Sequence, residues 1–237
     1  MKSSKYPIIY HPSYDIRLPE RHRFPGTKYS LLLRHLEDIG VIQNFLKYTP
    51  KPCTTENLSI AHKASYIEAI QTGNLSRENQ VRLGLPWSET LRERSFTAPN
   101  GTLLAAQLAL KTGIACHAAG GTHHAHWDFG AGFCVFNDLA YTARALIRMG
   151  LARRVLILDC DVHQGDGTAN ILSNDTNILT CSIHCAENYP IKKAVSDLDF
   201  AISRGSGDGD YLTVLRRCLS QIDRINFSPD FVLYDAA

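Results

Sequence analysis

The sequence predicts an α/β fold of three layers, in which a central, mainly parallel β-sheet is covered by helices on both faces. Two observations support this prediction. Short apolar runs alternate along the chain with longer segments of helical periodicity, and the apolar run Val155–Leu158 is typical of a buried strand. Strands that alternate with helices pair in parallel, because each helix carries the chain back to the same end of the sheet.

Each element is predicted from its own pattern. Pro7–Tyr10 is a short apolar run that predicts the first strand, and Lys28–Ile39 carries leucines at helical spacing before Gly40 ends it. Ser59 is the expected N-cap of the next helix. Pro99 is expected to break the chain. The predicted strands are 7–10, 154–159, 177–183 and 231–234, with an extended connection at 41–45. The predicted helices are 28–39, 60–72, 88–94, 101–118, 136–149, 168–172 and 211–225.

Length and composition limit the class of protein. The 237 residues are 44% hydrophobic and 20% charged, which suits one globular domain spanning 1–237. The formal charge of +2 includes no run of like charge, so we expect no nucleic-acid or membrane partner. Seven cysteines form no C-x-x-C pair and are expected to be reduced. The sequence shows no signal peptide and no stretch of eighteen apolar residues, so we expect a cytoplasmic protein, or a nuclear one in a eukaryote.

A carboxylate and an imidazole follow the buried apolar run. Asp161 and His163 lie two positions apart, and side chains at that spacing in an extended segment point to the same face. Ligands of open α/β sheets gather at the carboxyl ends of the strands, and Gly165 lets the backbone turn tightly there. These residue types can form half of a zinc or iron site. The alternative interpretation is a capping aspartate beside a buried, hydrogen-bonded histidine.

Two adjacent histidines lie in a glycine-punctuated loop after a predicted buried helix. An imidazole that acts as an acid or a base needs a partner on its other ring nitrogen, and Asp159 and Asp166 are the candidates. With different carboxylate partners, His123 and His124 can hold different protonation states. One ring can then serve as a base for water while the other stays charged and stabilises an oxyanion.

Three motifs together resemble the histone deacetylase superfamily, and are most similar to its class IV and bacterial deacetylase-like branch. They are Gly120–His124, Gly130–Asp138 and Asp159–Thr168, in this order along the chain. The similarity extends weakly to Tyr10–Pro12 and Ser182–His184. The resemblance implies an arginase/deacetylase-like fold. It also implies a zinc-dependent amide hydrolase that removes acetyl or longer acyl groups from lysine in proteins or from small acylated amines.

The resemblance also implies roles for individual residues. Asp161 and His163 match two of the three metal ligands, for zinc or, in the cell, iron. His123 and His124 match the catalytic tandem histidines, with Asp159 as the carboxylate partner of the first.

In the same comparison Asp166 matches the partner of His124, while Gly132 and Phe133 match residues that line the acyl-lysine tunnel. We expect His126 and Trp127 to pack at the mouth of that pocket. A structural potassium site is implied for Ser182 together with backbone oxygens of Asp159, Asp161, His163 and Ile183.

The sequence departs from the family pattern at one place. The third metal ligand of the family is an aspartate that would fall beyond Ala237, and Asp235 occupies an earlier, non-ligand position. The catalytic tyrosine of the family would also lie further on. Because catalytic zinc normally takes three protein ligands, we expect a domain that lacks its C-terminal part.

Two other functions remain open at this stage. A catalytically silent homologue could keep the same residues and act as a binding protein. A ureohydrolase of related fold is disfavoured, because its two metals are bridged through a D-x-H-x-D string and position 165 is Gly.

Overall fold

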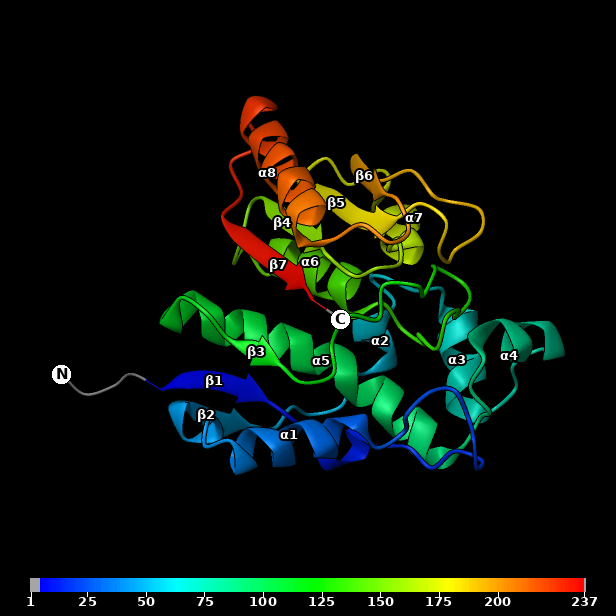
Figure 1. Cartoon of the computed structure of the whole chain (residues 1–237). Coiled ribbons are helices and arrows are strands. Elements are labelled where there is room, and N and C mark those ends of the chain that lie inside the picture. The colour runs from blue at the N-terminus through cyan, green and yellow to red at the C-terminus, as the bar shows by residue number, and fades with distance from the viewer. Residues whose placement is uncertain (1–4, 237) are drawn as a thin grey trace.

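The computed structural model describes residues 5–236, and it contains two parallel β-sheets with helices around them (Figure 1). The smaller sheet has the strand order β2-β1-β3 and the larger one the order β6-β5-β4-β7. The strands are β1 (Tyr6–Ile9), β2 (Phe45–Tyr48), β3 (Cys116–His117), β4 (Val155–Asp159), β5 (Ile178–Cys185), β6 (Leu198–Ile202) and β7 (Phe231–Asp235). The helices are α1 (Lys28–Asp38), α2 (Thr55–Leu58), α3 (Ala64–Thr72), α4 (Arg77–Leu83), α5 (Glu89–Thr112), α6 (Asp138–Arg148), α7 (Asp166–Leu172) and α8 (Asp208–Arg224), with short 3₁₀ turns at Pro12–Tyr14 and Ile42–Asn44.

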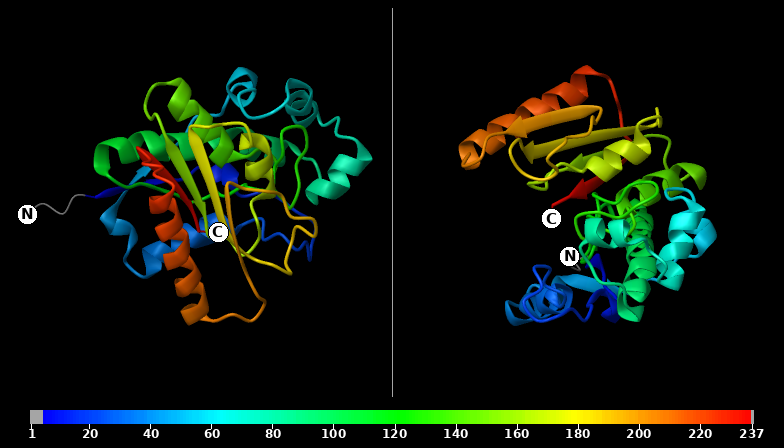
Figure 2. Two further views of the ribbon diagram at one scale, coloured as in Figure 1. Left: turned by 90° about the horizontal axis from the view of Figure 1, so that it is seen from above. Right: turned by 90° about the vertical axis from the view of Figure 1, so that its right-hand side faces the viewer.

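The larger sheet lies between two layers of helices, as predicted (Figure 2). Alternate residues of β4 face opposite layers: Leu156 packs in a cluster with Ile222 of α8, whereas Ile157 packs in a second cluster with Leu146 of α6. Helix α7 lies beside β5. Because both faces of β4 are covered, all of its residues are buried, as its apolar composition predicts.

Strand register places the carboxyl ends of β4 and β7 beside each other and beside Ser182 within β5. Asp159 at the end of β4 lies opposite Ser182 of β5 on one side and opposite Asp235 of β7 on the other. Ligands of parallel sheets bind at this edge, where loops leave the strands. The loop after β4, which carries the D-x-H string, therefore begins at the edge that the sequence predicts for the site.

Helix α5 corrects the sequence prediction of two helices separated at Pro99. It runs unbroken from Glu89 to Thr112, and Ser88 caps it by accepting a hydrogen bond from the Leu91 backbone N–H. A proline inside a helix removes one backbone hydrogen bond. That cost is offset by burial, since Pro99 and its neighbours pack in the interior, and α5 makes extensive contacts with β1 and α6.

Other boundaries also differ from the prediction. Ser59 follows α2 as its C-cap, and the helix predicted to begin at residue 60 begins at Ala64. Helix α7 begins at Asp166, two residues early, and the predicted end of the buried helix at 116–118 is strand β3. The connection predicted as extended at 41–45 contains a 3₁₀ turn. No prediction was made for α2, α4, β2 or β6.

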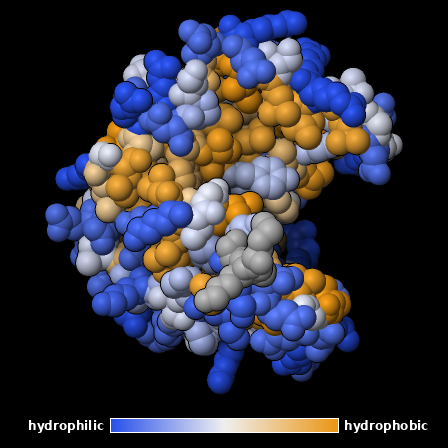
Figure 3. Space-filling view, turned by 90° about the vertical axis from the view of Figure 1, so that its left-hand side faces the viewer, coloured by the Kyte–Doolittle hydropathy of each residue, from blue (hydrophilic) through white to orange (hydrophobic). Residues whose placement is uncertain are grey.

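Two further features concern the surface and the helices. Apolar side chains gather over a broad area of one face, which is hollowed on one side (Figure 3). Among the helices of residues 5–236, none is long and apolar enough to cross a lipid bilayer.

Candidate active site

The loop between β3 and α6 carries the tandem histidines, and buried polar side chains fix its path. Asp138 accepts hydrogen bonds from the backbone N–H groups of Gly121 and Thr122 and from the Thr122 hydroxyl. The side-chain amide of Asn137 donates to the carbonyl of His123. Both anchors stand at the start of α6, where Asn137 also caps the helix. Helix α6 therefore positions the histidine loop.

Each of the two histidines is hydrogen-bonded to its own carboxylate. His123 Nδ1 lies 2.7 Å from Asp159 Oδ2, and His124 Nδ1 lies 2.7 Å from Asp166 Oδ1. The Nε2 atoms of the two rings are 3.2 Å apart, and all four side chains are buried. A carboxylate that accepts from Nδ1–H leaves Nε2 as the reactive nitrogen. The structure thus brings together the four residues that the sequence pairs in this way.

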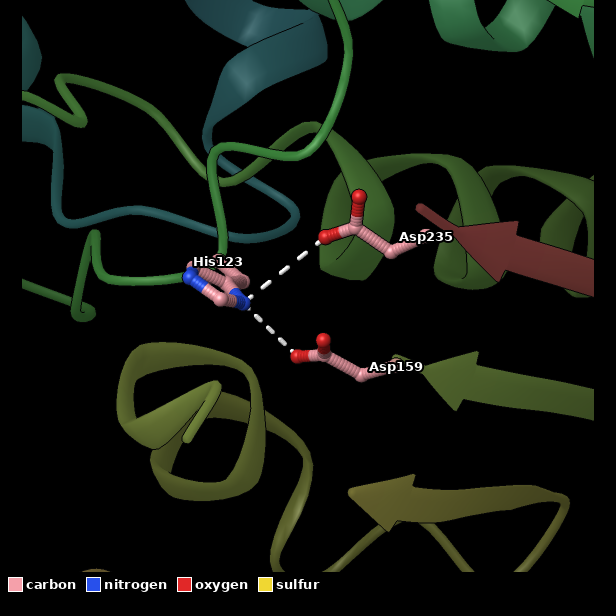
Figure 4. Close-up of side chains that lie close together, drawn as sticks. All are labelled: His123, Asp159 and Asp235. Carbon is pink, nitrogen blue, oxygen red and sulfur yellow. Dashed lines mark hydrogen bonds and ion pairs between the residues drawn. The ribbon is translucent and has the colours of Figure 1, made fainter. Parts of the chain in front are cut away.

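A second carboxylate faces His123. Asp235 Oδ2 lies 3.7 Å from His123 Nδ1, so the ring is drawn between Asp159 and Asp235 in Figure 4. Burial works to lower the pKa of His123, but these carboxylates prevail and raise that pKa to about 9. Burial, together with the charge of Asp159, raises the pKa of Asp235 to about 7. His123 is therefore the cationic member of the histidine pair near neutral pH.

His124 has the opposite character. Burial lowers its pKa, and the neighbouring charge of His123 lowers it further, against the hydrogen bond to Asp166. Two imidazoles in contact cannot both carry a charge at low cost. His124 is therefore neutral near neutral pH, and the lone pair on its Nε2 lies 3.2 Å from His123 Nε2.

Asp161 and His163 meet on the open side of the two rings. His163 Nδ1 lies 2.8 Å from Asp161 Oδ1, and the same oxygen lies 3.8 Å from His123 Nε2. Burial acts to raise the pKa of Asp161, but the hydrogen bond from His163 and the charge of His123 hold it below its usual value. One carboxylate oxygen and one imidazole nitrogen are donor types that zinc and iron accept, and here a hydrogen bond holds them together.

Within residues 5–236, three donor atoms meet within 4.8 Å at a different place, at His123, Asp159 and Asp235. A histidine must lose a proton to bind a metal, whereas the pKa of His123 is raised to about 9. Because all three side chains are also buried, these residues suit an ion pair better than a metal site. His163, by contrast, is 37% exposed and can be reached from solvent. No third protein donor joins Asp161 and His163 at this spacing in the described part of the chain.

The structure shows why a glycine and an aromatic residue stand at positions 132 and 133. Both have a left-handed backbone, with φ of 53° and 67°. A Cβ at Gly132 would lie 2.6 Å from Cδ2 of His124, so glycine admits the histidine ring. The Phe133 backbone N–H donates to the Leu83 carbonyl, and its ring packs at 5.5 Å from Phe24. The N-terminal segment and α4 therefore hold Phe133 in place.

Tyr189 is a site residue that the sequence prediction missed. Its ring lies edge-on to His124, with centroids 4.7 Å apart, and 6.2 Å from that of His163. The loop that carries it is held by Gln164, whose side-chain amide exchanges two hydrogen bonds with the backbone of Ala194. The only sequence signal was an aromatic residue in a segment without assigned structure, and that signal is weak.

The remaining predicted residues are placed as follows. His126 does more than pack at a pocket mouth, because its Nε2 lies 3.1 Å from Asp166 Oδ2. Ser182 lies beside Asp159 in register, and its hydroxyl is 3.0 Å from His184 Nδ1. The potassium site of Ser182 and the backbone oxygens stays a prediction.

The sequence profile of the histone deacetylase domain matches residues 22–236, and the chain belongs to this family. The chain is 46% identical to an uncharacterized protein of Picosynechococcus sp. strain PCC 7002, over 98% of the chain and 77% of that protein. It is 28% identical to Histone deacetylase 2 of Arabidopsis thaliana, over 98% of the chain and 63% of that protein. It is 32% identical to the acetoin utilization protein AcuC of Staphylococcus aureus strain COL, over 77% of the chain and 49% of that protein.

Solved structures confirm the predicted deacetylase-like fold. A histone deacetylase homologue from Aquifex aeolicus superposes with a TM-score of 0.81 at 22% identity, and covers 98% of this chain and 68% of its own. A homologue in complex with SAHA superposes with a TM-score of 0.80 at 23% identity, with the same coverage. The chain thus spans about half to three quarters of the length of these relatives.

Proposed function

We propose that the chain is a metal-dependent amide hydrolase that removes acetyl or longer acyl groups from lysine side chains or small amines. One observation carries the proposal: two buried imidazole–carboxylate pairs of opposite charge preference lie against the donor pair of Asp161 and His163. Amide hydrolysis needs a proton acceptor for water, a proton donor for the amine and a cationic group beside the developing oxyanion. This arrangement offers all three.

Asp161 and His163 would hold zinc, or iron in the cell, as two of its ligands. When bound, such an ion supplies Lewis-acid polarisation of the amide carbonyl and a more acidic water. The side chain of Asp161 is kept as an anion, since its pKa is held below the usual value, and its backbone N–H is fixed by Asp159 Oδ1 at 3.0 Å. The protein thus holds Asp161 in the anionic form that a metal ligand needs, and His163 Nδ1 would lose its proton when an ion binds.

His124 is the proposed proton-transfer residue. Its Nδ1–H donates to Asp166, so its Nε2 carries the lone pair that accepts a proton from water. Water then adds to the amide carbonyl, and the same nitrogen returns the proton to the amine as the carbon–nitrogen bond breaks. The products are a carboxylic acid and a free amine. His123, held as a cation by Asp159, supplies positive charge beside the oxyanion.

Phe133 and Tyr189 are the proposed walls of the substrate channel. The ring of Tyr189 contacts His124 edge-on, and Phe133 follows the glycine that contacts the same imidazole. Aromatic faces suit the methylene stem of an acyl-lysine, which has no polar atoms to satisfy. Two relatives, a histone deacetylase and a homologue complexed with SAHA, support the proposal of a deacylase. The relative AcuC is described as an acetoin utilization protein, so the acylated substrate is proposed only as a class.

The test is turnover of a fluorogenic acetyl-lysine peptide and of an acetylated polyamine, each with added zinc or iron(II). We expect turnover that is abolished by a chelator and by His124→Ala. His35→Ala is the matched control, because His35 lies exposed on α1 and should leave turnover unchanged. Turnover that resists the chelator, or no turnover of either substrate with either metal, would overturn the proposal.

A further inference from the structure

We propose that His126 is a positioning residue that holds Asp166 from the side opposite His124. The inference rests on the proposed function, in which His124 transfers the proton. Asp166 meets one imidazole at each oxygen: His124 Nδ1 at 2.7 Å from Oδ1, and His126 Nε2 at 3.1 Å from Oδ2. Despite burial, both hydrogen bonds hold the pKa of Asp166 well below its usual range, so the carboxylate is ionised and both rings donate.

The ring of His126 is itself held in place. It stacks on Phe129 with centroids 4.4 Å apart and an interplanar angle of 20°, and the Arg82 guanidinium lies over that phenyl ring. The backbone N–H of His126 donates to the Phe129 carbonyl, and its own carbonyl accepts from His62 Nδ1 at 2.9 Å. With only 15% of its side chain exposed, His126 presents a fixed donor to Asp166.

A fixed donor has a mechanical consequence for the catalytic pair. A carboxylate held at one oxygen can rotate about its Cβ–Cγ bond, and its other oxygen exchanges partners with water. A second donor on that oxygen fixes the carboxylate plane and thereby the direction of the hydrogen bond to His124. His126 would therefore affect proton transfer through Asp166, without touching the substrate.

Substitutions can separate this role from simple packing. The amide nitrogen of glutamine superposes approximately on Nε2 of histidine, whereas that of asparagine superposes on Nδ1. His126→Gln should keep the donor to Asp166, and His126→Asn should lose it at similar polarity. His126→Phe should keep the stacking on Phe129 and lose the donor.

The first experiment measures turnover of the acetyl-lysine peptide by these three variants of the whole chain. We expect kcat to fall about tenfold in His126→Phe and His126→Asn, with KM changed less than about twofold, because partners of catalytic groups typically contribute this much. His126→Gln should restore kcat to near the original value. Equal loss in all three variants would mean packing alone, and unchanged kcat in His126→Phe and His126→Asn would remove the role altogether.

The second experiment does not depend on turnover, so it separates this inference from the proposed function. The proton on His124 Nδ1 is followed by NMR in chain labelled at histidine nitrogens. We expect it to exchange with solvent faster in His126→Phe and His126→Asn than in the unmodified chain and His126→Gln. Equal exchange rates in all four proteins would overturn the inference even if the chain proves to be a deacylase.

Discussion

The Nε2 atoms of His123 and His124 lie 3.2 Å apart, although each ring is tied through Nδ1 to a different carboxylate. Rings this close cannot both be protonated at low cost in a buried site. The carboxylates around His123 hold its charge, and that charge keeps His124 neutral. The division of roles between base and cation therefore follows from one contact and its surroundings.

The raised pKa of His123 makes stability depend on pH. Its pKa is about 9 in the folded chain and about 6.5 in the unfolded chain, so the stabilisation is complete below about pH 6.5 and is lost as the pH rises through about 9. His123→Asn keeps a donor to Asp159 and cannot titrate. Between about pH 6 and pH 10 the unmodified chain should lose on the order of 3 kcal/mol of unfolding free energy relative to this variant. Urea unfolding at several pH values measures the difference, and a difference independent of pH would contradict the assignment.

Gly132→Ala should impair catalysis. The added methyl group would meet Cδ2 of His124 at 2.6 Å, and φ is 53°, so both strain and displacement of the ring are expected. Gly205→Ala is the control, since φ is 83° and nothing lies within 4 Å of its Cβ. We expect a stability loss of about 1 kcal/mol in the control and at least about 2 kcal/mol at Gly132, by urea unfolding. Turnover should fall only in Gly132→Ala. An equal loss of stability and turnover in both variants would refute the contact between residue 132 and the His124 ring.

Gly165→Ala tests the packing around the His123–Asp159 pair, at a position where alanine can adopt the backbone conformation of the glycine. A Cβ there would clash with Asp159 Oδ2, at a φ of −72° that alanine accepts. Gly207→Ala has a comparable φ of −95° and nothing within 4 Å. Thermal unfolding should show a loss of about 2 kcal/mol for the first and less than about 0.5 kcal/mol for the second. Similar stability of the two variants would mean that the glycine has another role.

Tyr189 should contribute to substrate binding. Tyr189→Ala removes the ring that contacts His124 edge-on, and we expect KM for the acetyl-lysine peptide to rise about tenfold. Tyr189→Phe keeps the ring and should change KM little. Steady-state kinetics of both variants provide the measurement, and a KM for Tyr189→Ala equal to that of Tyr189→Phe would exclude the ring from the channel.

The sequence predicts structure best where a feature depends on residues that are close together in the chain. The apolar run of β4 and the string after it predicted a buried strand that ends beside the site, and the structure places Asp161 and His163 there. Strand β6 was not predicted, although Leu198 and Phe200 are buried and alternate with exposed residues, a period of two that is typical of a strand. Pro99 misled the prediction, because a breaking residue was offset by long-range packing.

Contacts between distant segments could not be predicted. Tyr189 reaches His124 from a loop 65 positions away in numbering, and Gln164 holds that loop through the backbone of Ala194. His126 follows His124 by two positions, yet its bond to Asp166 depends on where α7 begins. Tertiary arrangement decides such contacts, and residue pattern alone does not encode them.

Metal content distinguishes the proposed metal-binding pair, Asp161 and His163, from the proposed proton-transfer residue, His124. Zinc bound per chain is measured by equilibrium dialysis for the unmodified chain and for Asp161→Asn, Asp235→Asn and His124→Ala. We expect Asp161→Asn to lose the ion, Asp235→Asn to keep it, and His124→Ala to keep it but lose turnover. If Asp161→Asn retains zinc and Asp235→Asn loses it, the ion lies among His123, Asp159 and Asp235, and the assignment to Asp161 and His163 is wrong.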